Sequence, residues 1–173
     1  MNDKQLIWEN YHNRILIEKT EIVKFKKDNW SKYVIQDAMY IVRSAGLDPK
    51  HINNKLKFLA YNKSELIGVT FNSHRKIKEQ QEDGKEITKA IYYFDIAVDP
   101  KHQGGTVGYL LTQACVNDAK SLKMPVLMYN DVVNPKMAQM LHKLFGFTFE
   151  HVDDGEGIPG HYNAHMEKEI PYP

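Results

Sequence analysis

The chain has 173 residues, of which 42% are hydrophobic and 26% are charged, and its formal net charge is +1. This length suits one soluble domain with its own core. A net charge so close to zero gives no bulk attraction to nucleic acid or to an anionic membrane, so neither is an expected partner. The single cysteine, Cys115, excludes an intrachain disulfide, and no apolar run is long enough to predict a membrane span. We therefore expect one cytoplasmic domain over residues 1–173, and a homodimer stays open.

The first half of the chain alternates between helical and strand-like patterns. We expect residues 1–14 to form a short helical extension and the alternating apolar positions of 15–25 to form a strand. Residues 29–45 then repeat apolar side chains at intervals of three and four, which predicts a helix that ends at Gly46. The β-prone runs KLKFLAY and ELIGVTF follow, and the polar residues 62–64 between them predict a hairpin.

A charged segment separates this hairpin from the strongest predicted strand. Residues 74–89 contain many charges and a turn residue, Gly84, so they are either an exposed loop or strand extensions that project from the sheet. The run AIYYFDIAV at 90–98 is rich in β-branched and aromatic residues and predicts a strand. It leads into VDPKHQGGTVGYLL, where glycines precede a new helical pattern. The predicted buried face of that helix consists of Val107, Leu110, Leu111, Ala114, Cys115 and Asp118.

The rest of the chain continues with a strand, a helix and two further strands. Residues 125–131 predict a strand, and Asn134 followed by Pro135 is typical of a helix start. That helix is expected to end at Gly146. Strand–helix–strand units of this kind predict an α/β fold in which helices pack on a mixed sheet.

The glycine-rich turn at 103–108 has the properties of an anion-binding loop. A helix N-terminus presents backbone N–H groups and a partial positive charge, and glycines let a ligand approach the backbone closely. The turn is not a P-loop, because the spacing G-x-x-x-x-G-K-[ST] is absent, and it lacks the dinucleotide spacing G-x-G-x-x-G. The alternative interpretation is a turn that has this shape but binds no ligand.

The same stretch resembles the signature of the GNAT superfamily of acetyl-CoA-dependent N-acetyltransferases, V-x-x-x-x-[R/Q]-x-x-G-x-[G/A]. Val98, Gln103 and Gly108 match it, whereas Thr106 replaces its penultimate glycine. A second match lies in NPKMAQMLHKLFGF, which is similar to the family pattern N-x(3)-A-x-x-L-[Y]-x-x-x-G-F. The resemblance implies a GNAT fold, with a mostly antiparallel twisted sheet of about seven strands flanked by helices. It also implies a splayed gap between the fourth and fifth strands.

The resemblance further implies how acetyl-CoA, the expected cosubstrate, would bind. Its pantetheine arm would pair with backbone groups at the splayed end of the fourth strand, a form of β-augmentation. The backbone of the following turn would hold the diphosphate, where Thr106 would either crowd the ligand or donate a hydrogen bond to it. The implied cofactor-binding residues are Ile96, Ala97, Val98, Gln103, Gly104, Gly105, Thr106, Val107, Gly108 and Asn134.

Two candidate catalytic residues also come from the resemblance. The family often uses a tyrosine of the second motif as proton donor, and His142 occupies that position here. A histidine can donate a proton near neutral pH, and a surface or cofactor-lining role is the alternative. Asp95 on the fourth strand is a candidate general base for the acceptor amine, with a structural salt bridge as its alternative, and Asp131 at the end of the fifth strand is the other carboxylate that could act as the base.

The sequence therefore predicts an N-acetyltransferase that moves an acetyl group from acetyl-CoA to a primary amine within a ternary complex. The alternative is a catalytically inactive GNAT-fold protein that serves as a binding or structural module. No motif identifies the acceptor. His161 and His165 have the spacing H-x-x-x-H, but they fall in a strand-like segment rather than a helix, so we expect no metal site.

Overall fold

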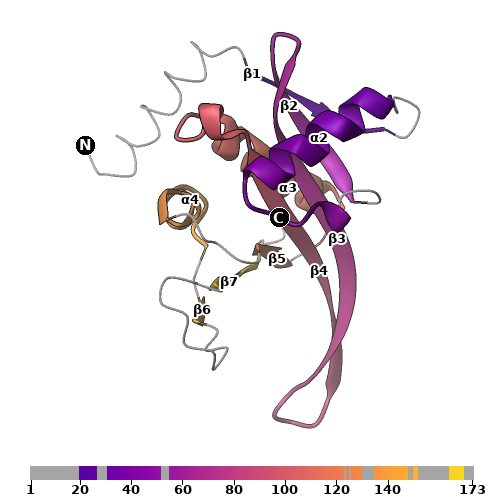
Figure 1. Ribbon diagram of the computed structural model, residues 1–173. Coiled ribbons are helices and arrows are strands. Elements are labelled where there is room, and N and C mark those ends of the chain that lie inside the picture. The colour runs from indigo at the N-terminus through magenta and orange to yellow at the C-terminus, as the bar shows by residue number, and fades with distance from the viewer. Residues whose placement is uncertain are drawn as a thin grey trace. The chain divides into compact units, whose positions relative to one another are not determined.

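The computed structural model describes residues 20–26, 31–51, 55–122, 124, 126–129, 135–147, 150–151 and 164–169. The expected helical extension at 1–14 lies outside them. Among the described residues, hydrogen-bonded strands follow the order β1-β2-β3-β4-β5-β7-β6, and helices are inserted after β1, β4 and β5 along the chain (Figure 1). This arrangement confirms the predicted mixed α/β fold. None of the described helices is long and apolar enough to cross a membrane.

The chain divides into two compact units, which are described separately below. The first consists of Met1–Phe71 and Asp95–Cys115, and the second of Asn72–Phe94 and Val116–Pro173.

The first unit begins with antiparallel strands that match the predicted hairpin. β1 (Thr20–Lys24) pairs with β2 (Leu56–Asn62), and β2 pairs with β3 (Glu65–Gln80). The turn between β2 and β3 contains Lys63 with a φ of 56°, a left-handed conformation that closes the hairpin. The register of β1 on β2 places Thr20 opposite Asn62, so these two polar residues lie side by side at one end of the pair.

Helix α2 (Lys32–Ser44) supplies one side of the core of the first unit. It begins after Ser31, whose hydroxyl accepts the N–H of Val34 at 3.1 Å and thereby caps the helix. Ala38, Ile41 and Val42 of the predicted helical pattern are buried, whereas Tyr33 is 75% exposed. The core cluster consists of Ala38, Ile41, Val42, Leu56, Leu59, Val69, Phe71 and Ala97.

Strands β3 and β4 (Glu86–Val98) run together as a long two-stranded ribbon (Figure 1). At its tip, Gly84 has a φ of +80° and the N–H of Gln81 donates to the carbonyl of Lys85 at 2.8 Å. An exposed ion pair of 2.6 Å joins Lys78 on β3 to Glu86 on β4. The charged segment 74–89 is therefore a pair of strand extensions, one of the two alternatives that the sequence left open.

The second unit contains the parallel part of the sheet. β5 (Val126–Tyr129) pairs in parallel with Ile91–Phe94 of β4, so α3 (Val107–Ser121) forms the helical connection between parallel strands. β7 (Ala164–Glu169) pairs antiparallel with β5 and with β6 (Glu150–His151).

The last predicted helix differs from a regular α-helix. α4 (Pro135–Met140) continues into a π-helical turn, Leu141–Phe145, which ends at Gly146 with a φ of 71°. The predicted end at Gly146 is thus confirmed, whereas the change of helical period was not predicted. Phe147, which follows, is fully buried and packs edge-on against Phe94 at 6.2 Å between ring centroids.

Tyr92 is the centre of a buried polar network in the second unit. Its hydroxyl donates to Oδ2 of Asp118 at 2.9 Å and accepts from the side-chain amide of Asn72. The ring of His74 lies 5.0 Å from that of Tyr92. Tyr92 is fully buried, so it belongs to the core. The network explains why the predicted buried face of α3 contains a carboxylate.

Candidate functional site

The chain turns after β4 because Asp99 fixes it at two points. The N–H of Asp99 donates to the carbonyl of Ile67 at 2.9 Å, and its carboxylate accepts the N–H of Lys101 at 2.8 Å. This second bond caps a short 3-10 turn, Pro100–His102. Asp99 is only 8% exposed, so it is largely withdrawn from solvent.

The next two residues give the turn its shape. The side-chain amide of Gln103 donates to the carbonyl of Val98 at 3.0 Å and ties the turn to the end of β4. Gly104 has a φ of +81°, a conformation that favours glycine. A Cβ added to Gly104 would meet no atom within 4 Å, so the space around it is open. Glycine is needed here for backbone conformation and not for lack of room.

Thr106 marks the point where the turn becomes α3. Its carbonyl accepts the N–H of Leu110 at 3.0 Å, which starts the helical hydrogen-bond pattern. The N–H groups of the first helical turn precede that pattern, and an α-helix supplies no acceptor for them. Thr106 itself is fully buried. Its side chain therefore occupies the interior, which argues against crowding of a ligand, one of the two alternatives for this residue.

Gly68, a residue that the sequence analysis missed, determines how closely α3 approaches β3. A Cβ on Gly68 would lie 2.9 Å from Cγ1 of Val107, 3.1 Å from Cδ1 of Leu111 and 3.3 Å from the carbonyl oxygen of Ala97. Carbon atoms do not pack at the shortest of these distances, so the missing side chain lets the first turn of α3 lie against the strand. A glycine inside the strand pattern ELIGVTF was the available signal, since such glycines often mark close approach.

The end of β4 presents the backbone that the resemblance assigned to the pantetheine arm. Ile96 and Ala97 are buried and Val98 is half-buried, which fits both simple sheet core and the pantetheine contact that the resemblance implies. Within the described residues, the parallel register of β4 on β5 runs from Ile91 opposite Val126 to Phe94 opposite Tyr129. Asp95 is half-buried and alternates with Ile96 along the strand. The expected splay involves residues 130–134, which lie outside the described part of the chain, and Asn134 is among them.

His142 lies in the π-helical turn of the second unit. Its Nδ1 lies 2.9 Å from the carbonyl oxygen of Phe147. A carbonyl oxygen only accepts, so Nδ1 is the donor in this contact. The residue as a whole is exposed.

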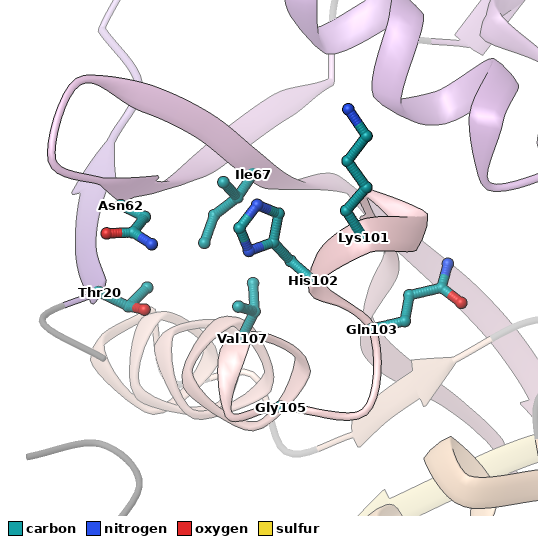
Figure 2. Close-up of a pocket in the computed structure, with 8 residues that line it drawn as sticks. All are labelled: Thr20, Asn62, Ile67, Lys101, His102, Gln103, Gly105 and Val107. Atoms are coloured by element: carbon teal, nitrogen blue, oxygen red, sulfur yellow. The ribbon is translucent and has the colours of Figure 1, made fainter. Parts of the chain in front are cut away.

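A small pocket opens beside the turn, within the first unit (Figure 2). Its volume is about 180 Å³, and its polar side chains come from both the turn and the start of the sheet. Figure 2 shows the His102 ring between Ile67 and Val107, with Asn62 and Thr20 opposite it. The sequence analysis did not predict this pocket, because its walls are far apart in the sequence. The lining residues are Thr20, Asn62, Ile67, Lys101, His102, Gln103, Gly105 and Val107.

Comparison with known proteins identifies the fold. The sequence matches no model of a known protein family and no curated protein sequence. Its structure is similar to that of a proposed GNAT-family acetyltransferase from Desulfovibrio desulfuricans, with a TM-score of 0.62, 15% identity and coverage of 88% of this chain and 99% of that one. Ard1 from Thermoplasma volcanium gives a TM-score of 0.62 at 13% identity, with the same coverage of both chains. This chain has the GNAT fold.

A third similar structure adds a ligand to the comparison. YncA from Salmonella typhimurium, a proposed acetyltransferase solved with its cofactor acetyl-CoA, gives a TM-score of 0.61 at 12% identity, and the match covers 89% of this chain and 95% of that one. At such identities the likeness establishes the GNAT fold. It also agrees with the fold that the motifs around Gln103 and His142 implied.

Proposed function

We propose that this protein is an N-acetyltransferase that moves the acetyl group of acetyl-CoA to a primary amine. The observation that carries the proposal is the turn at 103–108, which leads a glycine-containing backbone into the N-terminus of α3 on a GNAT fold. The acetyl-CoA bound to YncA, a protein of the same fold, supports the same cosubstrate here.

The described turn has the chemistry that a diphosphate needs. The first-turn N–H groups of α3 and the helix dipole favour an anion. Gly104 and Gly105 carry no Cβ, and the carboxylate of Asp99 is engaged by the backbone of Lys101. Because Thr106 is buried, the replacement of the family glycine leaves the open side of the turn clear.

The proposed binding residues follow from this arrangement. Backbone groups of the turn and of the first residues of α3 would hold the diphosphate, and the end of β4 would pair with the pantetheine arm. Asn134 keeps its proposed contact with that arm. The diphosphate residues are Gln103, Gly104, Gly105, Thr106, Val107 and Gly108, and the pantetheine residues are Ile96, Ala97 and Val98.

The proposed chemistry is direct transfer. The neutral amine attacks the thioester carbonyl carbon, a C–N bond forms, the C–S bond breaks, and CoA leaves as a thiolate. An amine with an ordinary pKa near 10.4 is protonated at neutral pH, so a base must remove its proton, and Asp95 is the proposed base. His142 is proposed to give a proton to the thiolate, and its Nδ1 contact with the carbonyl of Phe147 would orient the ring.

Two measurements test the proposal on the whole chain. Calorimetric titration with acetyl-CoA should show saturable binding. Incubation with acetyl-labelled CoA and separate pools of polyamines, lysine-containing peptides and small amines should place label on an acceptor nitrogen in at least one pool. Binding with no transfer to any pool would favour the binding-module alternative. No binding at millimolar acetyl-CoA would overturn the proposal.

A further inference from the structure

The pocket beside the turn is lined by side chains that suit an anion. The His102 imidazole lies among the lining side chains, and Lys101 also belongs to the lining, with its long side chain extending away from that ring in Figure 2. Thr20 and Asn62 add a hydroxyl and an amide from the paired ends of β1 and β2. The described lining contains no aspartate or glutamate. The nearby carboxylate of Asp99 is buried and accepts the N–H of Lys101.

The pocket is also small and has an apolar floor. Ile67 and Val107 are both nearly fully buried, and they lie on either side of the His102 ring (Figure 2). A volume of about 180 Å³ is too small for a nucleotide but ample for a tetrahedral oxyanion. Hydroxyl, amide, imidazole and ammonium groups are all donors to phosphate oxygens, and charge-assisted bonds of this kind are the strong ones.

We propose that this pocket binds a phosphate monoester, the one on the ribose of CoA. The inference rests on the proposed function. Gln103, Gly105 and Val107 line the pocket and also belong to the turn that would hold the diphosphate. CoA carries its diphosphate and its ribose phosphate on the same nucleotide, so the two groups are joined by a few covalent bonds. A ligand whose diphosphate lies on the turn therefore brings its second phosphate close to the pocket.

The matched ligands for the test are CoA and dephospho-CoA, which differ only in the ribose phosphate. We expect the wild-type protein to bind CoA about tenfold more tightly, since one charge-assisted contact is worth that much. Lys101→Met and His102→Gln should each reduce this preference to about twofold. Both variants should keep the wild-type affinity for dephospho-CoA. Lys50→Met is the control, because Lys50 is an exposed lysine outside the pocket lining, and it should keep the full preference.

The outcomes separate this inference from the proposed function. Equal affinity of the wild-type protein for the two ligands would overturn the ribose-phosphate site and leave acetyl-CoA binding intact. A preference that Lys50→Met removes as strongly as Lys101→Met would overturn it as well, since general electrostatics would then explain it. Inorganic phosphate is the probe for a free ion. If it shifts the His102 ring resonances while CoA shows no preference, the site takes free phosphate and the CoA assignment is wrong.

Discussion

Gly104 has a left-handed backbone conformation, and no protein atom lies near the position of an added Cβ. A substitution at this position therefore introduces backbone strain without a steric clash inside the protein. We expect Gly104→Ala to weaken acetyl-CoA binding about tenfold, because a β-carbon makes that backbone conformation about 1–2 kcal/mol less favourable. Gly104→Asn should lose less, since asparagine tolerates this conformation. Calorimetric titration of both variants checks the order. Equal losses would point to contact between the added Cβ and the ligand instead.

His142 offers a test of chemistry apart from binding. We expect His142→Ala to lower kcat about 100-fold, the usual size of a proton-transfer contribution, while the dissociation constant of acetyl-CoA stays within about twofold. His142→Asn is the matched variant. Its amide can still donate to the carbonyl of Phe147, but it cannot exchange a proton at neutral pH. If the asparagine variant recovers the rate, His142 has a structural role only.

The contact between β3 and α3 depends on Gly68, and it links the stability of the first unit to the geometry of the turn. We expect Gly68→Ala to lower the free energy of unfolding by about 1–3 kcal/mol, because the added carbon overpacks a filled interface. Acetyl-CoA affinity should fall with it, since the first turn of α3 must move. The clash at 2.9 Å is with the side chain of Val107.

A double-mutant cycle tests whether the contact with Val107 causes the loss of stability in Gly68→Ala. Val107→Ala alone removes buried methyl groups and should also destabilise the protein. The double variant should nevertheless be more stable than the sum of the two single losses predicts, because the smaller side chain makes room for the new Cβ. Strictly additive losses, measured by chemical denaturation, would show that Gly68 and Val107 do not meet as described.

The tip of the β3–β4 ribbon should respond to acid. The ammonium and the N–H of Lys85 both bond to the carboxylate of Asp83 and lower its pKa. Because the pKa of Asp83 is lower in the folded ribbon than in the unfolded chain, its ionised carboxylate stabilises the turn at pH values above the unfolded pKa. This stabilisation is lost as the pH falls below about 4. Hydrogen exchange at the Gln81 amide, corrected for intrinsic rates, should therefore accelerate in acid. Asp83→Asn should remove that pH dependence, and retention of it would assign the effect to another group.

Element type was predictable wherever the local pattern was strong. The aromatic and β-branched run of β4 and the apolar spacing of α3 each identified their element, and burial of Asp118 followed from the same spacing. The ribbon at 74–89 stayed ambiguous because its sequence is highly charged and shows no sustained hydrophobic alternation. The π-helical turn at Leu141–Phe145 was missed for a related reason. Apolar residues spaced at intervals of three and four indicate a helix, but they do not show whether its hydrogen bonds span four or five residues.

At the scale of the whole molecule, one part of the candidate site could be predicted from the sequence and another part could not. The turn around Gln103 and Gly104 was identified because it is contiguous in sequence and its glycines have a physical role. Gly68 and the His102 pocket were missed because their partners come from distant strands, and no local pattern encodes which residues the sheet register brings together. Burial of Thr106 could not be predicted from a local pattern either.

The last prediction concerns whether the chain unfolds as one domain. β3, β4 and α3 each contribute residues to both compact units, so neither unit can lose these elements without disturbing the other. We expect one calorimetric transition, with equal calorimetric and van't Hoff enthalpies. Acetyl-CoA at about 100 times its dissociation constant should add about 2.7 kcal/mol of stability, and Tm should rise by about 2–4 °C for each kcal/mol. Two transitions, of which acetyl-CoA shifts only one, would contradict the single domain and assign binding to one unit alone.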